Sequence, residues 1–304
     1  PVNATEINGR ALLWDTIREA IPFIITGSAI QLFQIIDQST FIHVMGWISK
    51  YSKSELLVQF AYFSANPNKI TMILIAVATS IGGVGIPLLT ENYVKGDFRS
   101  AARLVQDNLS MLIFFILPAT IGAVLVAEPL YTVFYGKPDG LALGLFIFAM
   151  LQTIILSLYT VLAPMIQALF QNRKAIIYFL YGVGVKLVLQ VPLIYIFKAY
   201  GPLLATTVGL IIPILLMYQE IRKVTGLNPK NLFKRSLLSV ILTVLMCIFV
   251  LVAELLIGLF LHPSGRISSF IYIALIGGIG LAVYGGLALK VRLMDRFIGS
   301  KAAS

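Results

Sequence analysis

The sequence predicts an all-α integral membrane protein with about eight transmembrane helices. Hydrophobic residues make up 59% of the 304 residues and charged residues only 12%, against about 25% charged in soluble domains. The mean hydropathy is +0.92. Apolar runs of about 20 residues, the length that crosses a bilayer, recur along the chain. These three observations exclude a soluble globular protein.

Eight apolar runs can be drawn. They cover approximately 17–45, 70–91, 106–127, 141–169, 175–197, 201–219, 236–261 and 268–289. Sixteen of the 23 Lys and Arg residues fall in the N-terminus, in 92–105, 170–174 and 220–235, and in the C-terminal tail; the opposite loops hold six. Because cytoplasmic loops carry the excess of Lys and Arg, both termini are predicted to be cytoplasmic. An even number of spans agrees with this, because it requires both termini to lie on the same side of the membrane.

The first span, 17–45, contains Pro22 and then a polar stripe. Gln31, Gln34 and Gln38 recur at i, i+3 and i+7, with Asp37 beside them, so they share one helical face. A polar face inside a membrane points to a bundle interior or an aqueous cavity. The following outer loop, 46–68, is rich in aromatic residues and is predicted to lie at the membrane interface.

The second span ends in a basic elbow. Ile70 to Leu89 is apolar and is thinned by glycines before Pro87. Within the elbow, small and apolar residues recur at i, i+3, i+4 and i+7: Phe98, Ala101, Ala102 and Val105. This spacing predicts an amphipathic helix lying on the membrane surface. Its charged residues are expected to dock it on anionic lipid.

The remaining spans carry prolines that favour kinks, at Pro118, Pro164, Pro192 and Pro213. The basic stretch 220–235 is predicted to be the longest cytoplasmic loop, and it divides the spans into six plus two. The basic residues are scattered over short loops, which is typical of membrane topology rather than of nucleic-acid binding. A single Cys247 and two distant histidines, His43 and His262, give no disulfide framework and no metal site.

A motif around the elbow resembles the MurJ/SpoVB-type lipid II flippases of the multidrug/oligosaccharidyl-lipid/polysaccharide (MOP) exporter superfamily. The motif runs from Pro87 and Glu91 through Gly96-Asp97 and Pro118 to Glu128-Pro129-Leu130 and Phe134-Tyr135-Gly136. The resemblance extends along the chain but covers only the second half of such a protein. It therefore implies a missing N-terminal lobe as partner. It also implies a second six-helix lobe, 1–221, followed by a basic loop and two C-terminal helices, 222–304.

The resemblance implies a transporter of the bacterial cytoplasmic membrane that is not an enzyme and uses no cofactor. Its expected substrate is an undecaprenyl-diphosphate-linked saccharide, above all lipid II, flipped for peptidoglycan or polysaccharide synthesis amid membrane lipids. The alternatives are a flippase for another polysaccharide precursor, a MATE-like drug/cation antiporter and a non-transporting scaffold. A membrane enzyme acting on polyprenyl phosphates is disfavoured, because the cytoplasmic loops contain few acids and no histidine.

Asp37 and Lys186 are the main site candidates, because an isolated charge deep in a span is costly. Asp37 is predicted either to couple transport to an ion or to pair with a neighbouring helix. Lys186, with Gln190 one turn further on, either meets a substrate phosphate or forms a salt bridge with Asp37. Gln31, Gln34 and Gln38 are predicted to contact the substrate. In the family, a cavity arginine stands near the position of Lys69. Lys69 is therefore a further candidate for binding the substrate; alternatively, it is a lysine at a helix end that snorkels to the headgroups.

Overall fold

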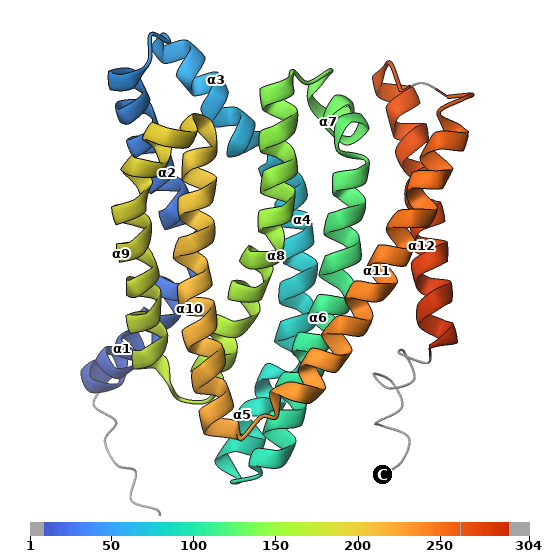
Figure 1. Cartoon of the computed structure of the whole chain (residues 1–304). Helices are drawn as coiled ribbons and strands as arrows, with labels where there is room; N and C mark the ends of the chain where they lie inside the picture. The colour runs from blue at the N-terminus through green and yellow to red at the C-terminus, as the bar shows by residue number, and fades with distance from the viewer. Residues whose placement is uncertain (1–8, 262, 292–304) are drawn as a thin grey trace, which may run out of the picture.

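The computed structural model describes residues 9–261 and 263–291, and these residues form α-helices and one short 3₁₀ helix with no strand. The predicted all-α class is confirmed (Figure 1). In chain order the helices are α1 (Gly9–Gly27), α2 (Ala29–Ile48), α3 (Lys53–Phe63), α4 (Ala65–Val84), α5 (Ile86–Val94), α6 (Phe98–Leu125), α7 (Ala127–Tyr135), α8 (Gly140–Ala168), α9 (Asn172–Phe197), the 3₁₀ helix η1 (Lys198–Tyr200), α10 (Gly201–Thr225), α11 (Pro229–Ile257) and α12 (Arg266–Lys290).

The helices are long and apolar enough to cross a membrane repeatedly. Six continuous helical segments of the described chain meet that standard, and the bent pair α1–α2 makes a seventh. One of the six, Asn172–Thr225, has 54 residues and contains both α9 and α10. These two run side by side and are joined at one end (Figure 1). Counted separately they bring the passes to eight, as predicted.

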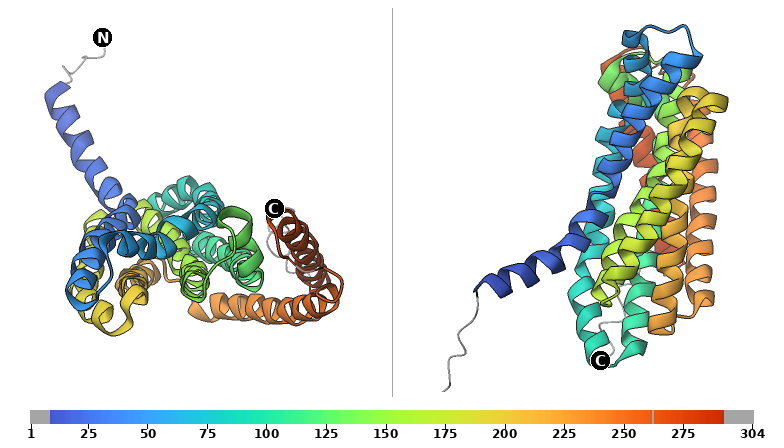
Figure 2. Two further views of the ribbon diagram at one scale, coloured as in Figure 1. Left: turned by 90° about the horizontal axis from the view of Figure 1, so that it is seen from above. Right: turned by 90° about the vertical axis from the view of Figure 1, so that its left-hand side faces the viewer.

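The first predicted span is two helices rather than one. α1 and α2 meet at Ser28 with a bend of 53°, so α1 leaves the bundle at an angle (Figure 2). Two side chains of α8 hold the end of α1. The Tyr159 hydroxyl donates to the carbonyl of Thr26 at 3.2 Å, and the Gln167 amide donates to the Thr26 hydroxyl at 2.7 Å. Gly27 at the junction explains the break, since glycine weakens a helix interior.

The predicted surface helix of the elbow is wrong. α6 is one continuous helix of 28 residues from Phe98 to Leu125. No glycine or proline interrupts it before Pro118, so nothing ends the helix between elbow and span. Ala101 and Val105 are buried in the same core as Leu109. The apolar face of the elbow therefore continues the packed face of the span instead of facing lipid.

Two predicted loops are also largely helical. The outer loop 46–68 contains α3, which a capping box between Ser52 and Glu55 starts. The stretch 220–235 is divided between the last turn of α10 and the first turns of α11, which leaves only 226–228 as a connection. Gly226 ends α10 in the left-handed conformation, with φ of +69°. In both stretches the polar residues that suggested a loop are divided between a short connection and the helices beside it.

The last two helices have a core cluster of their own, and they are also packed against the rest of the bundle. A large cluster of buried side chains draws on α1, α2, α4–α6, α8–α10 and, through Leu232, the start of α11. Further along, α11 and α12 pack against each other around Leu242, Met246 and Tyr284, with residues of α6 and α7 beside them. The two last helices stand at one edge of the bundle (Figures 1 and 2). The boundary expected at 221/222 falls inside α10, and the division into two domains stays a prediction.

The connections with most basic residues lie at one end of the bundle. The turns α5–α6, α8–α9 and α10–α11 are together, and the turns α2–α3, α9–α10 and α11–α12 are at the opposite end (Figure 1). This grouping is the one that the charge distribution predicts, and we refer to the first as the basic end.

We expect the basic end to face the cytoplasm. In a Cys247→Ser background, Ser264→Cys should react with a membrane-impermeant maleimide added to intact cells, because Ser264 is exposed in the α11–α12 turn. Lys230→Cys, exposed at the start of α11, should react only after the membrane is permeabilised. The reverse pattern of labelling would contradict the orientation.

Candidate functional site: a buried ion pair beside a polar pocket

A buried cluster of charged and polar side chains joins α2, α9 and α10. The Lys186 Nζ lies 2.6 Å from Asp37 Oδ1 and donates to the Thr206 hydroxyl at 2.5 Å. The Gln190 amide nitrogen donates to Asp37 Oδ1 at 2.8 Å and to the Thr40 hydroxyl at 2.9 Å. The predicted alternative of a salt bridge between Lys186 and Asp37 is therefore confirmed.

The surroundings of Lys186 leave it no direct contact with water. Its side chain is 0% exposed, and its ammonium group lies 4.9 Å from the centre of the Phe33 ring. Such a contact between a cation and a ring face is attractive. Asp37, Thr206 and Phe33 thus compensate for the loss of hydration of the ammonium group. An isolated charge in a membrane would have no such partners.

Two glycines bring Lys186 to this position. A side chain on Gly182 would meet the carbonyl oxygen of Gly209, and one on Gly209 would press on the Lys186 side chain. Both positions therefore require a residue without Cβ, and α9 and α10 approach closely there, as small residues permit in membrane proteins. This close approach puts Thr206 of α10 within hydrogen-bond distance of Lys186 and Asp37.

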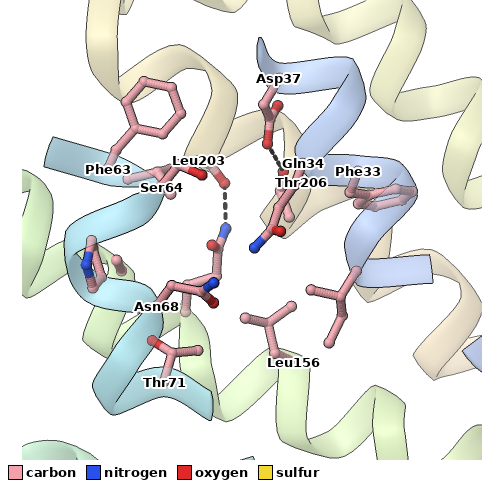
Figure 3. A pocket seen from close by; sticks show the side chains of 14 residues that line it. Phe33, Gln34, Asp37, Phe63, Ser64, Asn68, Thr71, Leu156, Leu203 and Thr206 are labelled. Atoms are coloured by element: carbon pink, nitrogen blue, oxygen red, sulfur yellow. Dashed lines mark hydrogen bonds between the residues drawn. The ribbon is translucent and has the colours of Figure 1, made fainter. Parts of the chain in front are cut away.

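A small polar pocket opens beside the cluster, between α2, α4, α8 and α10 (Figure 3). Its volume is about 50 Å³, which is enough for a few water molecules. Asp37 and Gln34 line one side, and Asn68 and Thr71 of α4 line the other. Gln152 of α8 also lines it, held by its hydrogen bond to the carbonyl of Leu203 at 2.7 Å. Asp37 is the only charged residue among the described residues that line the pocket.

The other predicted site residues are placed differently. Gln34 lines the pocket, whereas Gln31 and Gln38 do not line it and are exposed. Lys69 is exposed and its ammonium group lies over the rings of Tyr135 and Phe134 of α7, at 4.9 and 5.9 Å. The structure therefore brings together Asp37, Lys186 and Gln34, but neither Lys69 nor the outer glutamines. The roles of all these residues in transport stay predictions.

Several residues of the site were not found from the sequence. Thr206, Asn68 and Gln152 are uncharged, so the cost of burying a charge, which identified Asp37 and Lys186, does not single them out. Gln152 next to Thr153 in an otherwise apolar span is a weak signal of a polar interior. Among the described residues, no group of three or more His, Cys, Asp or Glu side chains could hold a metal ion; His262 lies outside them.

Comparisons with known proteins agree with the fold and with the resemblance to the MurJ/SpoVB-type flippases. The family model "Lipid II flippase MurJ" matches residues 10–274. The lipid II flippase MurJ of Bacillus subtilis (strain 168) is 28% identical over 296 residues, which are 96% of this chain and 54% of that protein. A solved structure, described as lipid II flippase MurJ in an inward closed conformation, aligns with a TM-score of 0.63 at 17% identity.

The chain spans about half the length of these relatives. The solved structure is matched over 91% of this chain but 54% of its own. At 17% identity it shows the shared fold, and the match of the family model over most of the chain shows the family. This multi-pass membrane protein belongs to the family of lipid II flippases named MurJ.

Proposed function

We propose that this chain forms one lobe of a flippase that moves an undecaprenyl-diphosphate-linked saccharide, lipid II, across the cytoplasmic membrane of a bacterium. The observation that carries the proposal is the match of the MurJ family model to residues 10–274. Since the chain corresponds to 54% of its relatives, the proposal includes a second lobe of comparable length. The chemistry is transport without covalent change, so the protein is not an enzyme.

The polar pocket is too small for a whole headgroup, but it presents polar side chains that can contact part of a hydrated headgroup. Gln34, Asn68 and Gln152 offer amide donors and acceptors inside a membrane bundle, as the sugar and peptide groups of such a substrate require. The prenyl tail needs no polar partner and can stay in lipid. We propose that the pocket faces the other lobe across the transport path and that the lobes rock around it, as in other secondary transporters.

The ion pair is proposed to fix the helices around that pocket. Lys186 is enclosed by Asp37, Thr206 and Phe33, so it does not present its charge to a diphosphate in this conformation. Asp37 both binds Lys186 and lines the pocket, so a change at the pocket acts on the pair directly. Its role as an ion-coupling residue is the alternative proposal, in which release from Lys186 exposes the carboxylate.

Complementation tests the proposed function. A protein that joins this chain to the first half of the Bacillus subtilis relative should restore growth to a strain depleted of its lipid II flippase, because the two lobes would complete a transport path. The chain expressed alone should reach the membrane and fail to restore growth. A joined protein that is abundant in the membrane but never restores growth would favour the flippase for another polysaccharide precursor.

A further inference from the structure

A pocket of about 590 Å³ lies at the basic end, between the first turns of α6 and α11. Three arginines line it: Arg99 and Arg103 from α6 and Arg235 from α11. Asp107 is the only carboxylate among its described lining residues. Asp97 lies beside Arg99 and Arg103 at the start of α6, so the three arginines exceed these two carboxylates by one positive charge. Gln106 and Asn231 add amide groups. This composition suits an oxyanion with several acceptor atoms.

The backbone adds to the attraction for an anion. α6 and α11 have 28 and 29 residues, and both begin at this pocket. The dipoles of both helices favour negative charge at these ends. The side chain of Asp97 already accepts from the N–H of Ser100 in α6, and that of Asn228 accepts from the N–H of Lys230 in α11. Arg235 donates to Asp107 at 2.5 Å across the two helices, which holds its guanidinium group in place. Arg99 and Arg103 follow one turn apart and are exposed, so they are open to a ligand that enters from outside.

The position of the pocket along the membrane normal indicates the source of that ligand. A helix of 28 residues is about 42 Å long at 1.5 Å per residue, whereas the hydrocarbon layer is about 30 Å thick. The first two turns of α6, with Arg99 and Arg103, precede the apolar stretch that starts after Asn108. Arg103 therefore lies near the level of the lipid headgroups, and Arg99 lies one turn, about 5 Å, further from the membrane, within reach of the headgroups for a long arginine side chain. The same reasoning places Arg235 of α11 near the headgroups and Asn231 one turn beyond it.

We propose that this pocket binds the phosphate group of an anionic phospholipid in the leaflet at the basic end. Arg99 and Arg103 contact the phosphate oxygens, for which the planar guanidinium group is well suited. The amides of Gln106 and Asn231 bind the remaining headgroup oxygens. The lipid bridges α6 to α11, and so ties the last two helices to the rest of the lobe at a place remote from the polar pocket.

Native mass spectrometry of the purified chain, reloaded with phosphatidylglycerol or phosphatidylcholine, tests this proposal. The Arg99→Gln/Arg103→Gln variant removes two charges from the pocket. Its matched control, Arg222→Gln/Lys223→Gln, removes two exposed charges from the last turn of α10, at the same end but outside the pocket. A third variant, Asn231→Trp, fills the pocket from its exposed side without altering the charge.

We expect one phosphatidylglycerol to be retained more tightly than phosphatidylcholine. The pocket variant should weaken its binding about 30-fold, since each basic residue near an anionic headgroup contributes about 1 kcal/mol and each 1.4 kcal/mol is tenfold. The control should change it less than about twofold, and Asn231→Trp should weaken it without loss of charge. Equal losses in pocket and control variants would overturn the proposal in favour of diffuse attraction.

The source of the phosphate is tested in the same experiment. Inorganic phosphate or undecaprenyl diphosphate is added at the concentration of the bound lipid. Retention of phosphatidylglycerol supports the proposal. Displacement by inorganic phosphate would show a soluble ligand, and preferential displacement by undecaprenyl diphosphate would assign the pocket to the transported lipid; either result overturns it. Neither result affects the proposed flippase activity, which is tested by growth.

Discussion

Replacing Asp37 or Lys186 singly should destabilise the protein strongly, and replacing both should restore most of the loss. Asp37→Asn and Lys186→Met each leave the other charge buried without its partner. Breaking a buried pair in this way costs about 3–5 kcal/mol. The double variant removes both charges, so its free energy of unfolding should return to within about 1 kcal/mol of the original, because well-packed neutral groups replace buried pairs at little cost. The measurement is unfolding in detergent, with abundance in the membrane.

The two single variants should not be equal. Without Lys186, the Asp37 carboxylate keeps the Gln190 amide at 2.8 Å and the Thr206 hydroxyl at 3.3 Å, and it borders a pocket that can hold water. In Asp37→Asn the ammonium group of Lys186, 0% exposed, loses its counter-charge and keeps only uncharged partners among those described, namely the new amide oxygen, the Thr206 hydroxyl and the Phe33 ring. We therefore expect Asp37→Asn to be the more damaging change.

Lys69→Met is the control for loss of a lysine as such. Lys69 is exposed, so Lys69→Met should lower the free energy of unfolding by less than about 1 kcal/mol, as is typical of surface charges.

Introduced into the joined two-lobe protein, the double variant of Asp37 and Lys186 also separates the two proposed roles of the pair. Growth would agree with a structural pair, and would reject binding of the diphosphate by Lys186. An abundant double variant that fails to support growth would show that one of the charges acts in transport. Unchanged stability in both single variants would remove the structural role of the pair, and unchanged growth in both would remove its role in transport.

The membrane fold could be predicted from the sequence because its signals are local. Apolar runs of sufficient length fixed the spans, and the distribution of Lys and Arg assigned them to the two ends. The elbow was predicted wrongly for a physical reason. Ala101 and Val105 have the spacing of a surface helix, but the same residues face the protein core when the helix continues, as it does in α6. Periodicity shows that one face is apolar and does not show what covers it.

The site was only partly predictable because its partners come from distant parts of the chain. Asp37 and Lys186 were found because charges are rare inside spans. Thr206 completes the cluster from 20 residues beyond Lys186, and its position depends on how closely α9 approaches α10. Lys69 had the residue type expected of a phosphate ligand, yet α4 directs it to the rings of α7. Residue type therefore identified candidates, and packing decided which of them meet.

Gly182→Ala should destabilise the protein, although alanine normally favours a helix. The added Cβ would meet the carbonyl oxygen of Gly209 and the ring of Pro213 on α10, and neither can move aside without shifting the backbone. Overpacking of this kind costs about 1–3 kcal/mol. Separation of α9 from α10 would also pull Lys186 away from Thr206, so the ion pair should weaken with the packing.

Gly184→Ala is the matched control on the same helix. Gly184 is exposed, and nothing lies within 4 Å of the position that its Cβ would take. The change should therefore stabilise the helix slightly, by up to about 1 kcal/mol. Thermal unfolding in detergent should move in opposite directions for the two variants. If Gly182→Ala unfolds at the same temperature as Gly184→Ala, then the close approach of α9 and α10 does not hold the site together.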